Sequence, residues 1–201
     1  MGEIGVGKLN VLKELKNGID GLDIAAIMNS DKNRSAGDVY LEKVNLTDEI
    51  IKYGGILERT SEANYWDLTF DEMIAKEYSL RSNKKVRKGN KQLIDEEHEF
   101  MVANINRKVV GENSILICKC ENIFLSMNWN GEEPPAGYIL EAQHSMRVSK
   151  AEKCYIASLL GGKKFVYKEI LRDDNVINMI IQIEKDFWFT NILNRVPPRN
   201  N

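Results

Sequence analysis

One residue that could do chemistry stands out in the strand-like run 115–121, where Lys119 is the single cation. Alternation along a strand puts Lys119 on the same face as Ile117 and Glu121, and Cys118 and Cys120 on the other. A lysine buried without a partner is costly. It therefore either extends along the sheet to reach water or faces a phosphate or a water molecule in a cleft.

A second candidate for chemistry is a basic run at residues 84–91. Its cations are Lys84, Lys85, Arg87, Lys88 and Lys91. Such a run can form a rim that contacts phosphates. Four acids between residues 95 and 99 follow at once and offset the charge, so a solvated loop or hairpin is the favoured interpretation.

The histidines and cysteines do not form a metal motif. His98 and His144 are far apart, without cysteines or carboxylates at zinc-site spacing. Cys118 and Cys120 lie two apart on a strand with no second pair, so packing is the better interpretation. With Cys154 they are three in number, which favours reduced thiols in a cytoplasmic protein.

Composition narrows the function further. The 201 residues include 28 Lys and Arg against 30 Asp and Glu, a net charge of −2. This balance argues against coating nucleic acid by bulk charge, but it allows a locally basic cleft. We find no apolar run near the ~20 residues that span a bilayer and no signal-peptide pattern. We therefore expect no membrane association.

Periodicity predicts the elements that must position these residues. Helices are expected at residues 23–29, 39–44, 65–81, 136–149 and 175–193. Strands are expected at 100–110, 114–120, 154–160 and 165–170, in two hairpins that turn at 111–113 and 161–164. This order predicts an α/β or α+β sandwich rather than a doubly wound dinucleotide-binding fold.

The lysine-bearing strand and its neighbours resemble a known family. Residues 99–119 (EFMVANINRKVVGENSILICK) look like the core FMLANxDxxVVGExxxLExK of the YqaJ-type viral recombinases, and residues 138–146 (YILEAQHSM) look like their helix YxxQxQHYM. Residues 18–27 (GIDGLDIAAI) resemble their opening GIGGSDIAAI, and residues 154–198 resemble their C-terminal segment. The likeness covers nearly the whole chain in the right order.

These recombinases are relatives of the phage lambda exonuclease in the PD-(D/E)xK nuclease superfamily. The resemblance implies a restriction-endonuclease-like core, with a central mixed sheet flanked by helices, in a single domain over residues 1–201. It implies a Mg²⁺- or Mn²⁺-dependent exonuclease that degrades linear duplex DNA from 5′ ends in phage recombination. Because lambda exonuclease is a ring-shaped trimer, it also implies a possible homo-oligomer.

Carried over residue by residue, the resemblance keeps part of the catalytic set. Lys119 falls on the lysine that orients the attacking water, and Gln143 falls on the glutamine of the helix. The helix acid falls on Asp71, with Glu72 beside it, and Lys16 falls on the basic, phosphate-binding residue that precedes the opening motif. These residues are the expected remnants of the site.

The same comparison shows three departures. The metal-binding aspartate is Asn106, the strand glutamate is Ile117, and the serine of the opening motif is Leu22. An engineered inactivation would explain Asn106 but neither of the other two. The pattern therefore indicates natural decay of the catalytic site.

Two hypotheses follow from these departures. In the first, the chain is a catalytically defective phage or prophage homologue that binds DNA ends, or a protein target in recombination or host defence. In the alternative, it is an active Mg²⁺- or Mn²⁺-dependent 5′-to-3′ exonuclease whose relocated site uses Asp71, Glu72, Asn106 and Lys119.

Overall fold

A five-stranded mixed sheet forms the centre of the computed structural model, which describes residues 18–31, 33–53, 62–89 and 92–199. The strand order is β1-β4-β5-β6-β7, where β5 and β6 run parallel and the other neighbours antiparallel. Its strands are β1 (Val86–Lys88), β4 (Arg107–Val109), β5 (Ser114–Glu121), β6 (Lys153–Leu160) and β7 (Lys164–Leu171). A separate two-stranded sheet pairs β2 (Gln92–Ile94) with β3 (Val102–Asn104).

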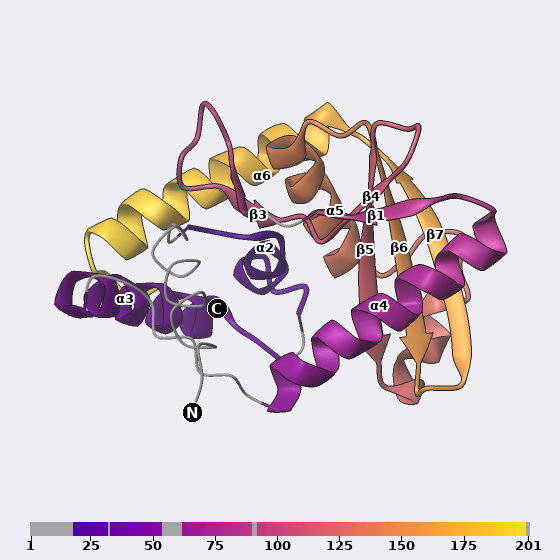
Figure 1. Cartoon of the computed structure of the whole chain (residues 1–201). Coiled ribbons are helices and arrows are strands. Elements are labelled where there is room, and N and C mark those ends of the chain that lie inside the picture. The colour runs from indigo at the N-terminus through magenta and orange to yellow at the C-terminus, as the bar shows by residue number, and fades with distance from the viewer. Residues whose placement is uncertain (1–17, 32, 54–61, 90–91, 200–201) are drawn as a thin grey trace, which may run out of the picture.

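Helices cover both faces of the central sheet (Figure 1). The helices are α2 (Gly21–Ile27), α3 (Ala36–Tyr53), α4 (Glu62–Ser82), α5 (Ala136–Ser149) and α6 (Asp174–Asp186). Of these, α4 packs on one face of the sheet and α5 on the other, while α3 lies away from the sheet. A 3₁₀ helix, η1 (Ile123–Trp129), follows β5, and a π-helical segment, η2 (Phe187–Leu193), continues α6. Within the described ranges, no helix combines the length and apolar character that crossing a membrane requires.

Each face of the sheet has its own apolar core, because alternate strand residues point to opposite sides. On the α4 side, Ile74 and Tyr78 pack with Leu116 and Tyr155. On the α5 and α6 side, a larger cluster includes Ile115 and others such as Met146, Ile156, Ile177 and Ile180. The strand carrying Lys119 therefore lies between two packed layers.

The architecture confirms the predicted mixed sheet flanked by helices. The helix predicted at residues 136–149 coincides with α5, and the predicted helix at 65–81 lies within α4. The structure has a longer helix than the one predicted at 39–44, since α3 covers Ala36–Tyr53. The last predicted helix, at 175–193, is divided between α6 and the π-helical η2.

One predicted strand, at residues 100–110, is wrong as a single element. The strand is interrupted at residues 105 and 106, so that β3 pairs with β2 while β4 pairs with β1 and β5. The basic run predicted as a loop or hairpin also contains β1. Both differences come from pairing with distant partners, which local alternation does not specify.

A fully buried ion pair ties the two-stranded sheet to the helical layer. His144 on α5 places Nδ1 2.7 Å from Glu184 Oε1 on α6, and Nε2 2.9 Å from the Val102 carbonyl oxygen on β3. Since a carbonyl only accepts, Nε2 carries a proton, and a carboxylate partner requires a second proton on Nδ1. Burial alone would lower the pKa of His144, but its attraction to Glu184 and these hydrogen bonds raise the pKa to about 9. The histidine is thus a charged structural residue.

This pair predicts a pH dependence of stability. The folded pKa of about 9 lies above the ordinary value of 6.5. The stabilisation is therefore complete below about pH 6.5 and is lost as the pH rises through about 9. Urea unfolding from pH 6 to 10 should show this decline in the wild type, and Glu184→Gln should remove it. Glu184→Ala should cost about 3–5 kcal/mol, whereas Glu96→Gln, in an exposed pair with Lys150, should preserve the decline.

Candidate functional site

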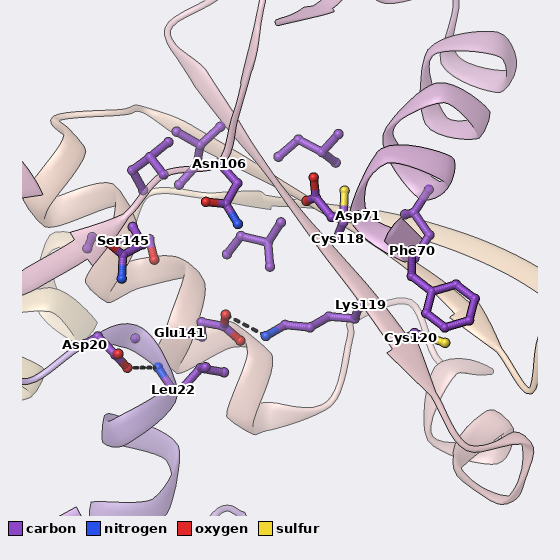
Figure 2. A pocket seen from close by; sticks show the side chains of 18 residues that line it. Asp20, Leu22, Phe70, Asp71, Asn106, Cys118, Lys119, Cys120, Glu141 and Ser145 are labelled. Atoms are coloured by element: carbon purple, nitrogen blue, oxygen red, sulfur yellow. Dashed lines mark hydrogen bonds and ion pairs between the residues drawn. The ribbon is translucent and has the colours of Figure 1, made fainter. Parts of the chain in front are cut away.

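A pocket of about 390 Å³ opens along the edge of β5 (Figure 2). Strand β4 pairs with β5 only at Ile115 and Leu116, although β5 continues to Glu121. The edge of β5 beyond Leu116, which has no pairing with β4, lies between α4 on one side and the start of α2 with α5 on the other. All three helices contribute side chains to the pocket. The early end of this strand pairing thus creates the space.

The start of α2 is held firmly at the pocket. Asp20 caps the helix by accepting hydrogen bonds from the Leu22 and Asp23 backbone N–H groups, and the Asp23 side chain accepts from the Asp20 N–H. Buried Asp23 also forms ion pairs with Arg34 and Lys43. Burial, followed by the neighbouring charge of Asp23, raises the pKa of Asp20. These contacts place Asp20 and Leu22 in the pocket wall.

A glycine allows α2 to approach α5 closely at this point. A Cβ atom on Gly21 would lie 2.9 Å from Glu141 Cγ and 3.0 Å from the Glu141 carbonyl oxygen. Any larger residue at position 21 would displace Glu141 or separate the helices. Gly21 therefore helps to fix where the Glu141 carboxylate enters the pocket.

Lys119 has a partner that the sequence analysis did not assign. Its Nζ lies 2.7 Å from Glu141 Oε1, and both side chains are mostly buried. The ammonium also lies 5.6 Å from the ring centre of Tyr138, which is within cation–π range. The lysine thus faces the pocket, and its charge is balanced by an acid from α5.

Asp71 is likewise held by a cation. The Arg107 Nε lies 2.7 Å from Asp71 Oδ2, and a second guanidinium nitrogen bonds to the same oxygen. The side chains are only 9% and 15% exposed. Burial raises the pKa of the adjacent Cys118 thiol and the nearby Asp71 charge adds to this, so Cys118 is a neutral thiol here. Arg107 was not recognised from the sequence.

The predicted metal positions do not all come together. Asp71, Asn106 and Ile117 line the pocket with Lys119. Glu72 is not among the lining residues, and its exposed carboxylate accepts a hydrogen bond from Lys88 at 2.9 Å. That bond lowers the pKa of Glu72.

Gln143, for which the resemblance implies a catalytic role, is not among the residues that line the pocket. Its side-chain N–H donates to the Leu171 carbonyl at 2.8 Å, and its oxygen accepts from the Asp173 N–H at 3.0 Å. Both bonds join α5 to the chain between β7 and α6, which is a structural role. Lys16, the other carried-over residue, lies outside the described residues.

The basic run is divided between paired and exposed cations. Lys84 forms an ion pair with Glu112, and Lys88 forms one with Glu72, while Lys85 and Arg87 are exposed. Three of the four acids that follow in sequence pair with cations outside this run. Asp95 and its neighbours form these ion pairs with Arg147 and Lys150.

The residues of this pocket do not fit the metal ion that the resemblance implies. Mg²⁺ requires hard oxygen ligands, usually with at least one or two carboxylates available to it. Here Ile117 offers no ligand and Asn106 offers a neutral amide. The three carboxylates of the lining already have partners: Asp71 bonds to Arg107, Glu141 to Lys119, and Asp20 to the backbone N–H groups at the start of α2. Among the residues that the structure describes, no group of three or more His, Cys, Asp or Glu could hold a metal ion.

Comparison with known proteins identifies relatives along most of the chain. Residues 12–152 match the model of the YqaJ-like viral recombinase domain. The uncharacterised protein YqaJ of Bacillus subtilis (strain 168) is 37% identical over 189 residues, which cover 93% of this chain. The chain spans 57% of that relative's length. These matches confirm the family resemblance.

Solved structures share the fold. An alkaline exonuclease from Laribacter hongkongensis aligns with a TM-score of 0.71 and 15% identity, covering 92% of this chain and 91% of the other. A phage-related exonuclease from Haemophilus somnus 129PT aligns with a TM-score of 0.60 and 15% identity, covering 92% and 99%. At this level of identity the likeness confirms the exonuclease fold.

Asp71 and Glu72 are neighbours on α4, but removing their cationic partners should change the unfolding free energy by different amounts. Arg107→Met leaves Asp71 as a mostly buried, unpaired carboxylate, which should cost about 3–5 kcal/mol of unfolding free energy. Asp71→Asn combined with Arg107→Met should recover much of this loss. Lys88→Met, which leaves exposed Glu72 unpaired, should change stability little. Urea denaturation checks all three, and equal losses for Arg107→Met and Lys88→Met would contradict the burial argument.

Proposed function

The chain belongs to the YqaJ-like viral recombinase family, and on that basis we propose that it binds the ends of duplex DNA at this pocket without hydrolysing them. The observation that carries the proposal is the retained opening at β5. Lys119 still faces it, whereas Asn106 and Ile117 stand where the family motif has metal-binding acids. The opening and its lysine remain, whereas two of the motif's three metal-binding acids do not.

The charges in the pocket support binding without a metal ion. A cluster of unpaired carboxylates repels phosphates unless a cation neutralises it. In this pocket Arg107 neutralises Asp71, and Lys119 neutralises Glu141. Lys85, whose carbonyl accepts from the Val110 N–H, lies at the end of β4 away from the opening. Strand β1 then runs beside β4 toward the opening, with the exposed cations Arg87 opposite Lys108 and Lys88 opposite Arg107. These cations supply the phosphate contacts of the proposal.

One observation favours the alternative of an active exonuclease. Glu141 brings a carboxylate into the pocket beside Lys119, and a relocated Mg²⁺ or Mn²⁺ site would need such an acid. Against it, Glu72 points elsewhere and Glu141 is bonded to Lys119. Binding to a protein target and assembly into a ring both stay predictions.

DNA-end binding predicts opposite effects of two substitutions that each remove one charge. Lys119→Gln should weaken binding about tenfold and reduce the salt dependence by about one phosphate contact. Glu141→Gln should strengthen binding, because it removes a negative charge and releases Lys119. Fluorescence anisotropy in EDTA, with a linear 5′-phosphorylated duplex and a closed dumbbell of equal length, measures both. Equal affinity for the linear and closed duplexes would exclude end binding.

Loss of hydrolysis predicts that the wild type releases no nucleotides from linear duplex with Mg²⁺ or Mn²⁺. The variant Asn106→Asp/Ile117→Glu restores the two acids of the motif and should bind Mn²⁺ measurably by calorimetry, whereas the wild type should not. Glu72→Gln serves as the control variant for the Mn²⁺ binding measurement, because Glu72 is not among the residues that line the pocket. Wild-type digestion that disappears in Lys119→Gln would instead establish the active exonuclease.

A further inference from the structure

Helix α4 carries a row of apolar side chains on the side that faces away from the sheet. Trp66, Met73 and Leu80 follow one another at intervals of seven residues and are 46%, 56% and 71% exposed. We propose that this row is a dimer interface, at which α4 packs against α4 of a second copy of the chain in antiparallel orientation. The inference goes beyond the proposed function, because it does not depend on whether the pocket binds DNA.

The contacts of α4 with its own sheet do not cover this row. Ile74 and Tyr78 pack in the core over β5 and β6. Since an α-helix turns once every 3.6 residues, Met73 and Leu80 project from nearly the opposite side of α4, which lies on the outside of the fold (Figure 1). Single exposed apolar residues are common on protein surfaces, whereas a set of them in one place indicates an interaction site.

The spacing of the row specifies the kind of surface that fits it. Apolar residues with a seven-residue repeat form the seam of a coiled coil, in which the side chains of each helix insert between those of the other. Thr69 and Lys76 occupy the intermediate positions of this seam, three residues after Trp66 and Met73. From Trp66 to Leu80 the seam is about 21 Å long. Its complement is therefore a second helix.

The charges beside the seam favour a second copy in antiparallel orientation. Exposed Lys76 forms no ion pair with the residues that the structure describes, and the Glu72 side chain is 65% exposed. In a parallel pair the two Lys76 side chains would lie opposite each other and repel. In an antiparallel pair Leu80 inserts between Trp66 and Met73 of the second copy, which brings Lys76 beside Glu72 of that copy. Two-fold symmetry forms this contact twice.

A single helix pair of this length is a small interface. Stable interfaces bury about 1,200–2,000 Å², and smaller ones belong to transient contacts. We therefore expect a dissociation constant in the micromolar range, with monomer and dimer in exchange. A two-fold pair also closes on itself, whereas a ring needs two different surfaces on every copy.

Sedimentation equilibrium of the full chain measures this association. We expect the mass to rise with concentration from that of the monomer to twice that value. Met73→Glu places a carboxylate from each copy in the seam and should weaken the dimer at least about tenfold. Phe124→Glu is the matched control, because Phe124 is an 86% exposed apolar residue on η1, and it should leave the association unchanged. Circular dichroism checks that both variants are folded.

An exchange of charges tests whether the partner is a second copy. Lys76→Glu brings two acids together at each contact and Glu72→Lys brings two cations together, so each variant alone should dimerise more weakly than the wild type. In an equimolar mixture of the two variants, every contact joins a glutamate to a lysine. The mixture should therefore form heterodimers, which native mass spectrometry detects when one variant is isotopically labelled.

Several outcomes overturn the inference. A monomer at every concentration, or a mass three times that of the monomer, would exclude the two-fold dimer. A dimer of unchanged strength in folded Met73→Glu would place the interface elsewhere on the surface. If the mixed charge variants associate no better than either variant alone, the partner of the seam is not a second α4.

Discussion

The short pairing between β4 and β5 is the constraint on which the site depends. Hydrogen bonding between these strands reaches Leu116 and then stops, because the chain at Asn104–Asn106 has turned toward the second sheet. Backbone groups on a free strand edge need other partners, and here the edge borders a pocket instead of another strand. If β3 and β4 formed one long strand, it would close the opening and bury Lys119 against its neighbour.

The charges along this opening are arranged in opposite pairs. The nuclease site that the family resemblance implies gathers several acidic side chains, and a metal ion offsets the repulsion between them. This chain has a guanidinium beside Asp71 and an ammonium beside Glu141. Partly buried pairs with good geometry tolerate the low dielectric, whereas a lone carboxylate does not. The carboxylates and cations of the pocket therefore neutralise one another within the protein.

The sequence predicted those elements whose boundaries are marked locally. Helix α5 begins after Pro135 and ends at Lys150 in the left-handed conformation, and Gly161 and Gly162 adopt the positive φ that the β6–β7 hairpin requires. The local sequence carries no comparable signal for pairing between segments that are far apart in the chain. Arg107 meets Asp71 across 36 positions of sequence, and nothing in either neighbourhood indicates the other. The split of residues 100–110 was hidden for the same reason.

The acid on α5 could have been found from helical spacing. Tyr138, Glu141 and Ser145 lie three and four residues apart and so share one face, whereas Gln143 is two positions from Glu141 and points elsewhere. The family motif has Glu at position 117 and Gln at position 141, and this chain has Ile and Glu there. The carboxylate near Lys119 has thus moved from the strand to the helix. Such an exchange keeps the lysine charge balanced within the fold while it removes the strand ligand that a metal ion would use.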